Sequence, residues 1–141
     1  MSRRGVPEAL RRWLETLGER CEYCRTSEWV TGMPLEADHI QPLAKGGAAS
    51  KENLCRACSS CNTSKGDRTE ATDPMTGQAG PLFNPRRQKW SEHFTWSEDG
   101  TRVIGLTACS RATIEALQMN NARIIRARRL WGAAGWHPPA N

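Results

Sequence analysis

Apolar residues near the amino end recur at the spacing of a helix. Four of them fall at positions i, i+3, i+4 and i+7: Leu10, Trp13, Leu14 and Leu17. Pro7 suits a first helical turn, and Gly18 suits the residue that follows a helix. The pattern therefore predicts a helix over Val6–Leu17 with one apolar face.

The central part of the chain has shorter patterns. Residues Leu35–Ile40 predict a short strand, and Lys45–Gly47 predict an open turn because glycine tolerates positive φ. A further helix is expected to begin near Ser59 or Ser60 and to run to Lys65. Polar residues and turns separate these elements, so a small domain with both strands and helices is expected.

The carboxyl-terminal half has a different pattern, which predicts a connector, a hairpin and a long helix. Residues 69–89 contain three prolines and two glycines with little periodicity, which predicts a connector. His93–Trp96 and Arg102–Thr107 predict a β-hairpin, because Asp99-Gly100 between them is a strong turn signal. Residues Arg111–Leu130 predict one long helix that carries several arginines.

Composition adds two constraints. The chain has 141 residues, 38% of them hydrophobic, and six cysteines. A core of that size often needs a disulfide or a metal to stabilise it. The charged amino end lacks the apolar run of a signal peptide or membrane helix, so a cytoplasmic location without membrane contact is expected. In a reducing compartment, paired cysteines bind metal more often than they form disulfides.

Charge is concentrated at the two ends. The net charge is +5, and residues 1–20 carry five arginines against three glutamates. Residues 111–141 carry five arginines against one glutamate, whereas the centre is balanced. Basic flanks around a neutral centre suit a polyanion such as nucleic acid. A solvated basic surface explains the same distribution, so charge alone leaves both interpretations open.

The cysteines form the strongest local motif. They give two Cys-x-x-Cys pairs, Cys21 with Cys24 and Cys58 with Cys61. Two such turns facing each other complete a tetrahedral, structural zinc site without an open position. By spacing alone, Cys55-x-x-Cys58 is an alternative second pair. Cys55 and Cys109 are otherwise expected to be small buried residues.

A group of polar residues with catalytic chemistry lies between the two pairs and directly after the second. Asp38 and Asn62 offer oxygen atoms, which Mg²⁺ prefers as ligands. The imidazole of His39 is a suitable general base near pH 7. On a regular strand, His39 would point away from Asp38, unless a bulge or the strand end brings both side chains to one side. A lone histidine is more often structural than catalytic.

The order of these motifs resembles the HNH endonuclease family, the ββα-metal nucleases, in its zinc-stapled form. The resemblance covers residues 21–68 and rests on a series of motifs: Cys21-x-x-Cys24, Asp38-His39, Gly46-Gly47, Asn53, Cys58-x-x-Cys61-Asn62 and Lys65. It implies that His39 is the general base and that Asn53 orients it. It also implies that Asp38 and Asn62 hold a catalytic Mg²⁺ or Mn²⁺. Because Asn62 directly follows Cys61, the resemblance favours Cys58 with Cys61 as the second zinc pair.

The resemblance implies an α+β fold with a small ββα core. The expected division is an N-terminal helix in 1–20, the nuclease core with its zinc site in 21–68, and 69–141 as connector, hairpin and basic helix packing on the core. The implied activity is metal-dependent hydrolysis of DNA phosphodiesters, with a homodimer expected if both strands are cut. The alternatives are a zinc-bound DNA-binding module without cleavage and a structural interaction protein.

Several basic residues are candidates for contact with nucleic acid. They are Lys65 and Arg68 after the expected metal helix, and Arg123 and Arg126 in the expected long helix, where Arg128 and Arg129 extend the basic cluster. The alternative interpretation is that each of these residues lies on a solvent-exposed helix surface and contacts no phosphate.

Overall fold

The computed structural model describes residues 5–140, which fall into two compact units. The first unit consists of residues 5–69 together with 84–87, and the second of residues 70–83 and 88–140. The chain therefore returns briefly to the first unit after the second has begun.

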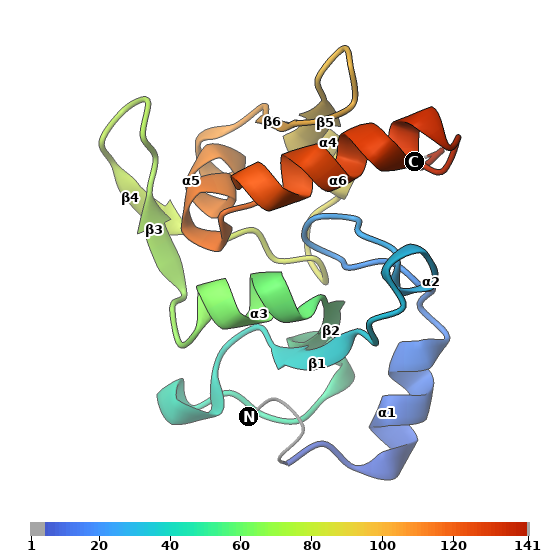
Figure 1. Ribbon diagram of the computed structural model, residues 1–141. Coiled ribbons are helices and arrows are strands. Elements are labelled where there is room, and N and C mark those ends of the chain that lie inside the picture. The colour runs from blue at the N-terminus through green and yellow to red at the C-terminus, as the bar shows by residue number, and fades with distance from the viewer. Residues whose placement is uncertain (1–4, 141) are drawn as a thin grey trace. The chain divides into compact units, whose positions relative to one another are not determined.

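The first unit contains one antiparallel strand pair and three helices, with two short 3-10 turns. Its elements are α1 (Glu8–Glu15), α2 (Glu28–Thr31), β1 (Glu36–His39), η1 (Leu43–Lys45), η2 (Lys51–Asn53), β2 (Leu54–Ala57) and α3 (Ser59–Lys65). β1 pairs with β2 so that Asp38 lies opposite Cys55 and His39 opposite Leu54. Figure 1 shows α3 beside this strand pair, and the two elements are in contact. The predicted strand and helix are thereby confirmed within a residue or two at each end.

A small apolar cluster holds α1 against the strand pair. Its buried members are Val6, Leu14 and Leu54, and the partly buried members are Leu10, Trp13 and Ala37. The predicted apolar face of the first helix is thus confirmed for three of its four residues. Leu17 lies beyond the end of α1 and is 37% exposed, because the helix stops at Glu15 rather than Leu17.

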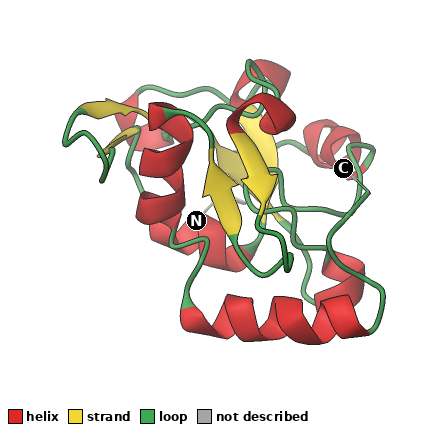
Figure 2. Ribbon diagram, turned by 90° about the horizontal axis from the view of Figure 1, so that it is seen from above, coloured by secondary structure: helices red, strands yellow, loops and turns green. Residues whose placement is uncertain are grey.

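The second unit contains two hairpins and three helices. Its elements are β3 (Glu70–Thr72), β4 (Ala79–Pro81), α4 (Trp90–His93), β5 (Phe94–Trp96), β6 (Val103–Gly105), α5 (Ala108–Leu117) and α6 (Ala122–Ala133). Helix α5 packs against β3, β4 and β6. The strands throughout residues 5–140 are short, with three or four residues each (Figure 2).

The two hairpins of this unit show where local patterns succeed and fail. The predicted hairpin around Asp99 is confirmed, since β5 pairs with β6 and Asp99 accepts the backbone N–H of Thr101 at 3.0 Å. The predicted connector 69–89 is not entirely irregular, because it contains the β3–β4 hairpin. Asp73 stabilises that hairpin by a two-pronged ion pair with Arg111 of α5, a partner 38 residues away.

The prediction of one long helix over 111–130 is wrong, because two helices occupy this region. Helix α5 ends at Leu117, and Gln118 adopts a left-handed conformation with φ of 52°. Asn121 then caps α6, accepting the backbone N–H of Ile124 at 3.0 Å. Asparagine competes for backbone donors in this way and favours helix starts, which explains why the helical periodicity is interrupted here.

The α+β class predicted from the sequence is confirmed by this mixture of helices and short strands. No helix within residues 5–140 has both the length and the apolar composition required to cross a bilayer.

Candidate functional site

Four cysteines of the first unit converge on one point. The Sγ atoms of Cys21, Cys24, Cys58 and Cys61 all lie within 4.8 Å of one another, and those of Cys24 and Cys58 are 3.7 Å apart. Two tight turns produce this arrangement. The backbone N–H groups of Tyr23 and Cys24 donate to the Cys21 sulfur, and that of Cys61 donates to the Cys58 sulfur, each at 3.4 Å.

The chemistry of this donor set fits zinc. Burial raises the pKa of the Cys21 thiol well above its ordinary value, whereas hydrogen bonds from the neighbouring cysteines, Cys21 first, lower the pKa of Cys24 well below it. Four thiols this close cannot all ionise without a cation to balance their charge. A tetrahedral Zn²⁺ supplies that balance, and four sulfur ligands make the site structural rather than catalytic.

The remaining two cysteines do not belong to the cluster. Cys55 is fully buried on β2, where its thiol lies 3.6 Å from a carboxylate oxygen of Asp38. The expected choice of Cys58 with Cys61 over Cys55 with Cys58 is therefore confirmed. Cys109 is half-buried in the second unit, so its predicted role as a small buried residue holds only in part.

A second site lies between the end of β1 and helix α3. It is an open pocket of about 440 Å³ lined by Glu36, Asp38, His39 and Asn62, among other residues. Asp38 and His39 both reach it because His39 is the last residue of β1, where the regular alternation of the strand ends. The predicted base and the two predicted cation ligands are thus brought together.

Asp38 is almost fully buried and is held by two hydrogen bonds besides the contact with the Cys55 thiol. Its Oδ2 accepts a hydrogen bond from the Tyr23 hydroxyl at 2.8 Å, and its Oδ1 accepts one from the Lys65 ammonium at 3.2 Å. Tyr23 lies between the zinc ligands Cys21 and Cys24, so the first cysteine turn is tied directly to this carboxylate. A carboxylate has about four acceptor positions, so Asp38 can still accept a further ligand.

His39 is 6% exposed, and its Nε2 is buried without a hydrogen-bond partner. Burial lowers the pKa of His39 from its ordinary value, partly offset by the charge of Asp38. The neutral imidazole is therefore favoured, which is the form that a general base requires. The Lys65 ammonium donates to the His39 backbone carbonyl at 3.0 Å and helps to hold the residue in place.

Asn53 connects the two ends of the loop that follows His39. Its Oδ1 accepts the backbone N–H of Gln41 at 2.8 Å, and its Nδ2 donates to the carbonyls of Gln41 and Ala48 at 3.0 and 2.9 Å. The backbone carbonyl of Asn53 also accepts the N–H of Ile40 at 2.8 Å. This geometry supports the predicted role of Asn53 in orienting His39, because the loop begins at the next residue.

The two glycines of this loop have different tasks. Gly46 has a φ of +87°, with open space around the position of a Cβ atom. Gly47 has no such backbone requirement, but a Cβ there would lie 1.7 Å from the Gln41 carbonyl oxygen. Gly46 therefore serves the turn, whereas Gly47 allows the loop to pass close to Gln41.

The glycine pair offers a matched comparison. Gly46→Ala is expected to lower the free energy of unfolding by about 1 kcal/mol, the cost of a left-handed residue with a Cβ atom. Gly47→Ala should cost more, about 3 kcal/mol, because rigid backbone cannot yield as a side chain can. Urea denaturation of both zinc-loaded variants measures the difference. Equal losses in the two would contradict the close approach at Gly47.

Asn62 has a partner that the sequence pattern did not single out. Its Nδ2 donates to Oε1 of Glu36 at 2.7 Å, across 26 residues of sequence. The only sequence clue is that Glu36 lies two residues before Asp38, which places both on the same face of a strand.

The candidate nucleic-acid contacts lie in contrasting environments. Lys65 is 2% exposed, and its ammonium donates hydrogen bonds to the Asp38 carboxylate and the His39 carbonyl. The ammonium is therefore not available to a phosphate in this arrangement. Arg68 is exposed and donates to the Ser64 carbonyl. In the second unit, Arg123 and Arg126 are exposed on α6.

Arg128 of α6 is a structural residue rather than part of a basic surface. It is 1% exposed, and its guanidinium donates to the carbonyls of Thr101 and Met119 and to Oδ1 of Asn120. The basic cluster expected on this helix is therefore reduced to Arg123, Arg126 and Arg129, which are exposed.

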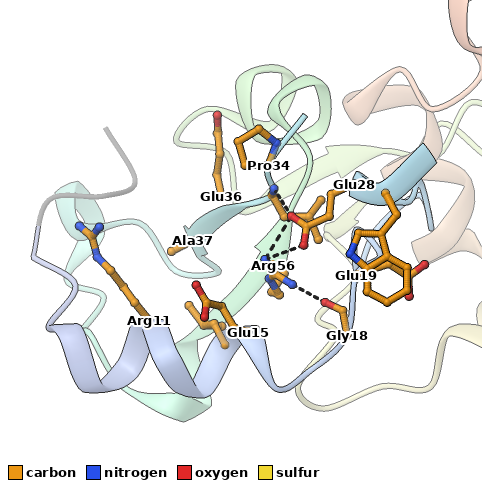
Figure 3. Close-up of a pocket in the computed structure, with 12 residues that line it drawn as sticks. Arg11, Glu15, Gly18, Glu19, Glu28, Pro34, Glu36, Ala37 and Arg56 are labelled. Carbon is orange, nitrogen blue, oxygen red and sulfur yellow. Dashed lines mark hydrogen bonds and ion pairs between the residues drawn. The ribbon is translucent and has the colours of Figure 1, made fainter. Parts of the chain in front are cut away.

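A further pocket of the first unit, of about 530 Å³, lies between α1 and the start of β1 (Figure 3). Its most buried charge, Arg56, is 8% exposed and donates to the Gly18 carbonyl and to the carboxylate of Glu28. Arg56 and Glu28 are therefore paired with each other at this pocket.

The strand pair, helix α3 and four-cysteine cluster of the first unit together define a zinc-stapled ββα domain. Residues 21–68 match the family model described as HNH endonuclease, and this segment of the chain is an HNH domain with a zinc-capable cysteine site. The resemblance noted from the motifs is thereby confirmed. No curated protein and no solved structure gives a significant match to the chain.

Proposed function

We propose that this protein is a metal-dependent endonuclease that hydrolyses DNA phosphodiesters, with His39 as the general base. One observation carries the proposal: His39, whose Nε2 is buried without a hydrogen-bond partner, lines the same pocket as Asp38 and Asn62. Leaving a buried nitrogen unpaired costs stability, and such costs are concentrated at functional sites.

The donor set of this pocket fits a hard divalent cation such as Mg²⁺ or Mn²⁺. Carboxylate and amide oxygens are the ligands that these ions prefer, and an open pocket leaves room for the waters they retain. Asp38 and Asn62 would hold the ion, which would supply positive charge at the scissile phosphate when bound.

The protein's own residues account for the rest of the reaction. The neutral His39 imidazole accepts a proton from the attacking water. Asn53 holds the loop that begins beside His39, and Lys65 and Tyr23 hold Asp38 in place. In the second unit, the exposed Arg123 and Arg126 of α6, together with Arg68 of the first, would contact backbone phosphates.

The first test is cleavage of supercoiled plasmid by the zinc-loaded protein. Nicked or linear product is expected with Mg²⁺ or Mn²⁺ and not after the added cation is removed by a chelator that leaves the zinc bound. Parallel incubations with single-stranded DNA and RNA identify the preferred substrate. Binding without cleavage under every cation tested would favour the rival function, a zinc-bound DNA-binding module. Cleavage of RNA alone would contradict the choice of DNA.

A further inference from the structure

Glu36 occupies a position in the pocket that none of the roles above uses. Its Oε1 accepts a hydrogen bond from Nδ2 of Asn62 at 2.7 Å, and both residues are half-buried. Hydrogen bonds to a carboxylate are stronger than those between neutral groups. Because Nδ2 is held by Glu36, the amide of Asn62 has a preferred orientation, which leaves Oδ1 as its free acceptor. Figure 3 shows the Glu36 side chain pointing away from Arg56 and Glu28.

The charges of the pocket make Glu36 more than a hydrogen-bond acceptor. The carboxylate of Asp38 is paired with the Lys65 ammonium, and the side chains of both are nearly buried, at 5% and 2% exposure. That pair has no net charge, and Asn62 is neutral. Among the described residues that line the pocket, Asp67 is the one remaining carboxylate, and it is exposed to solvent, where screening weakens its attraction. A dication therefore depends on Glu36 for a net negative charge at close range.

These observations lead us to infer that Glu36 completes the cation site. Glu36 orients Asn62 so that Oδ1 faces the ion, and it supplies the negative charge that the Asp38–Lys65 pair lacks. The inference rests on the proposed cation site. His39 lines the same pocket, and its buried Nε2 without a hydrogen-bond partner independently indicates that a ligand belongs there.

The test separates the two contributions of Glu36 by two substitutions. Mn²⁺ is titrated into the full zinc-loaded protein by isothermal calorimetry, and the Asn62 side-chain amide is followed by NMR in the zinc-loaded protein before Mn²⁺ is added. Glu36→Gln keeps an acceptor for Asn62 but removes the charge, and is expected to weaken Mn²⁺ binding about 10-fold with little change at the Asn62 amide. Glu36→Ala removes both, and should weaken binding toward 100-fold and shift the Asn62 amide signals.

The matched control is Glu15→Gln, which removes the same charge from an exposed position of α1. It should bind Mn²⁺ as the wild type does. Zinc content and circular dichroism establish that each variant is folded.

The outcomes keep this inference distinct from the proposed nuclease function. Wild-type affinity in Glu36→Gln, or a wild-type protein that binds no Mn²⁺ in this pocket, would overturn the role of Glu36. Mn²⁺ binding that depends on Glu36 in a protein that cleaves no nucleic acid would support the cation site while refuting the nuclease proposal.

Discussion

Cys58→Ser is expected to unfold the first unit. A structural zinc site contributes an apparent binding free energy of about 10–16 kcal/mol, as much as the whole stability of a typical domain. The apolar cluster that holds α1 to the strand pair is small, with Val6, Leu14 and Leu54 as its buried members. Without zinc, it would have to offset the conformational entropy of the unit almost alone.

The measurement is zinc content together with thermal denaturation and an amide NMR spectrum of the full chain. Cys58→Ser should lose bound zinc, and the dispersed signals of residues 5–69 should collapse. The matched control is Cys109→Ser, which changes a half-buried cysteine outside the cluster and should keep one zinc ion and the wild-type Tm. A Cys58→Ser protein with full zinc content and unchanged Tm would contradict the structural role of this site.

His39→Ala should lower the rate of cleavage by about 10²–10⁴-fold, the usual contribution of a positioned general base. The fold should be unaffected, because the Nε2 of His39 makes no hydrogen bond that would be lost. The measurement is the initial rate of plasmid nicking at saturating Mg²⁺, with zinc content and Tm determined on the same preparation.

Two further variants make the result specific. His39→Gln keeps a polar side chain of similar size but provides no general base. Its cleavage rate should be as low as that of His39→Ala. His137→Ala removes an imidazole from the second unit, where it contacts the Gly100 carbonyl, and should retain the wild-type rate. A folded His39→Ala protein that cleaves within a few-fold of the wild type would remove His39 from the role of general base.

Local sequence was informative wherever one turn or one face decides the geometry. The Cys-x-x-Cys spacing predicted the zinc cluster because each pair needs only a tight turn to direct both thiols to one side. The apolar spacing of Leu10, Trp13 and Leu14 predicted the buried face of α1, since side chains three and four residues apart share a face. The Asp99-Gly100 dipeptide likewise predicted the β5–β6 hairpin.

Predictions failed at the β3–β4 hairpin, which has a distant partner, and at the break between α5 and α6, where a local turn interrupts the helical pattern. The β3–β4 hairpin is stabilised by the ion pair between Asp73 and Arg111. The sequence near residue 73 contains no pattern that predicts this ion pair. The end of α5 at Leu117 depends on the left-handed turn at Gln118, which the arginine-rich helical pattern conceals.

The candidate site divides in the same way. The order of motifs along the chain was sufficient to predict the four-cysteine cluster and, through the family resemblance, the domain type. The same order singled out Asp38, His39 and Asn62, which line one pocket. Folding was needed to show that Lys65 is buried against Asp38 and that Glu36 holds Asn62. Each of these contacts joins residues more than 25 positions apart. A contact across that distance is created by the packing of α3 on β1, and it leaves no periodic trace in the sequence.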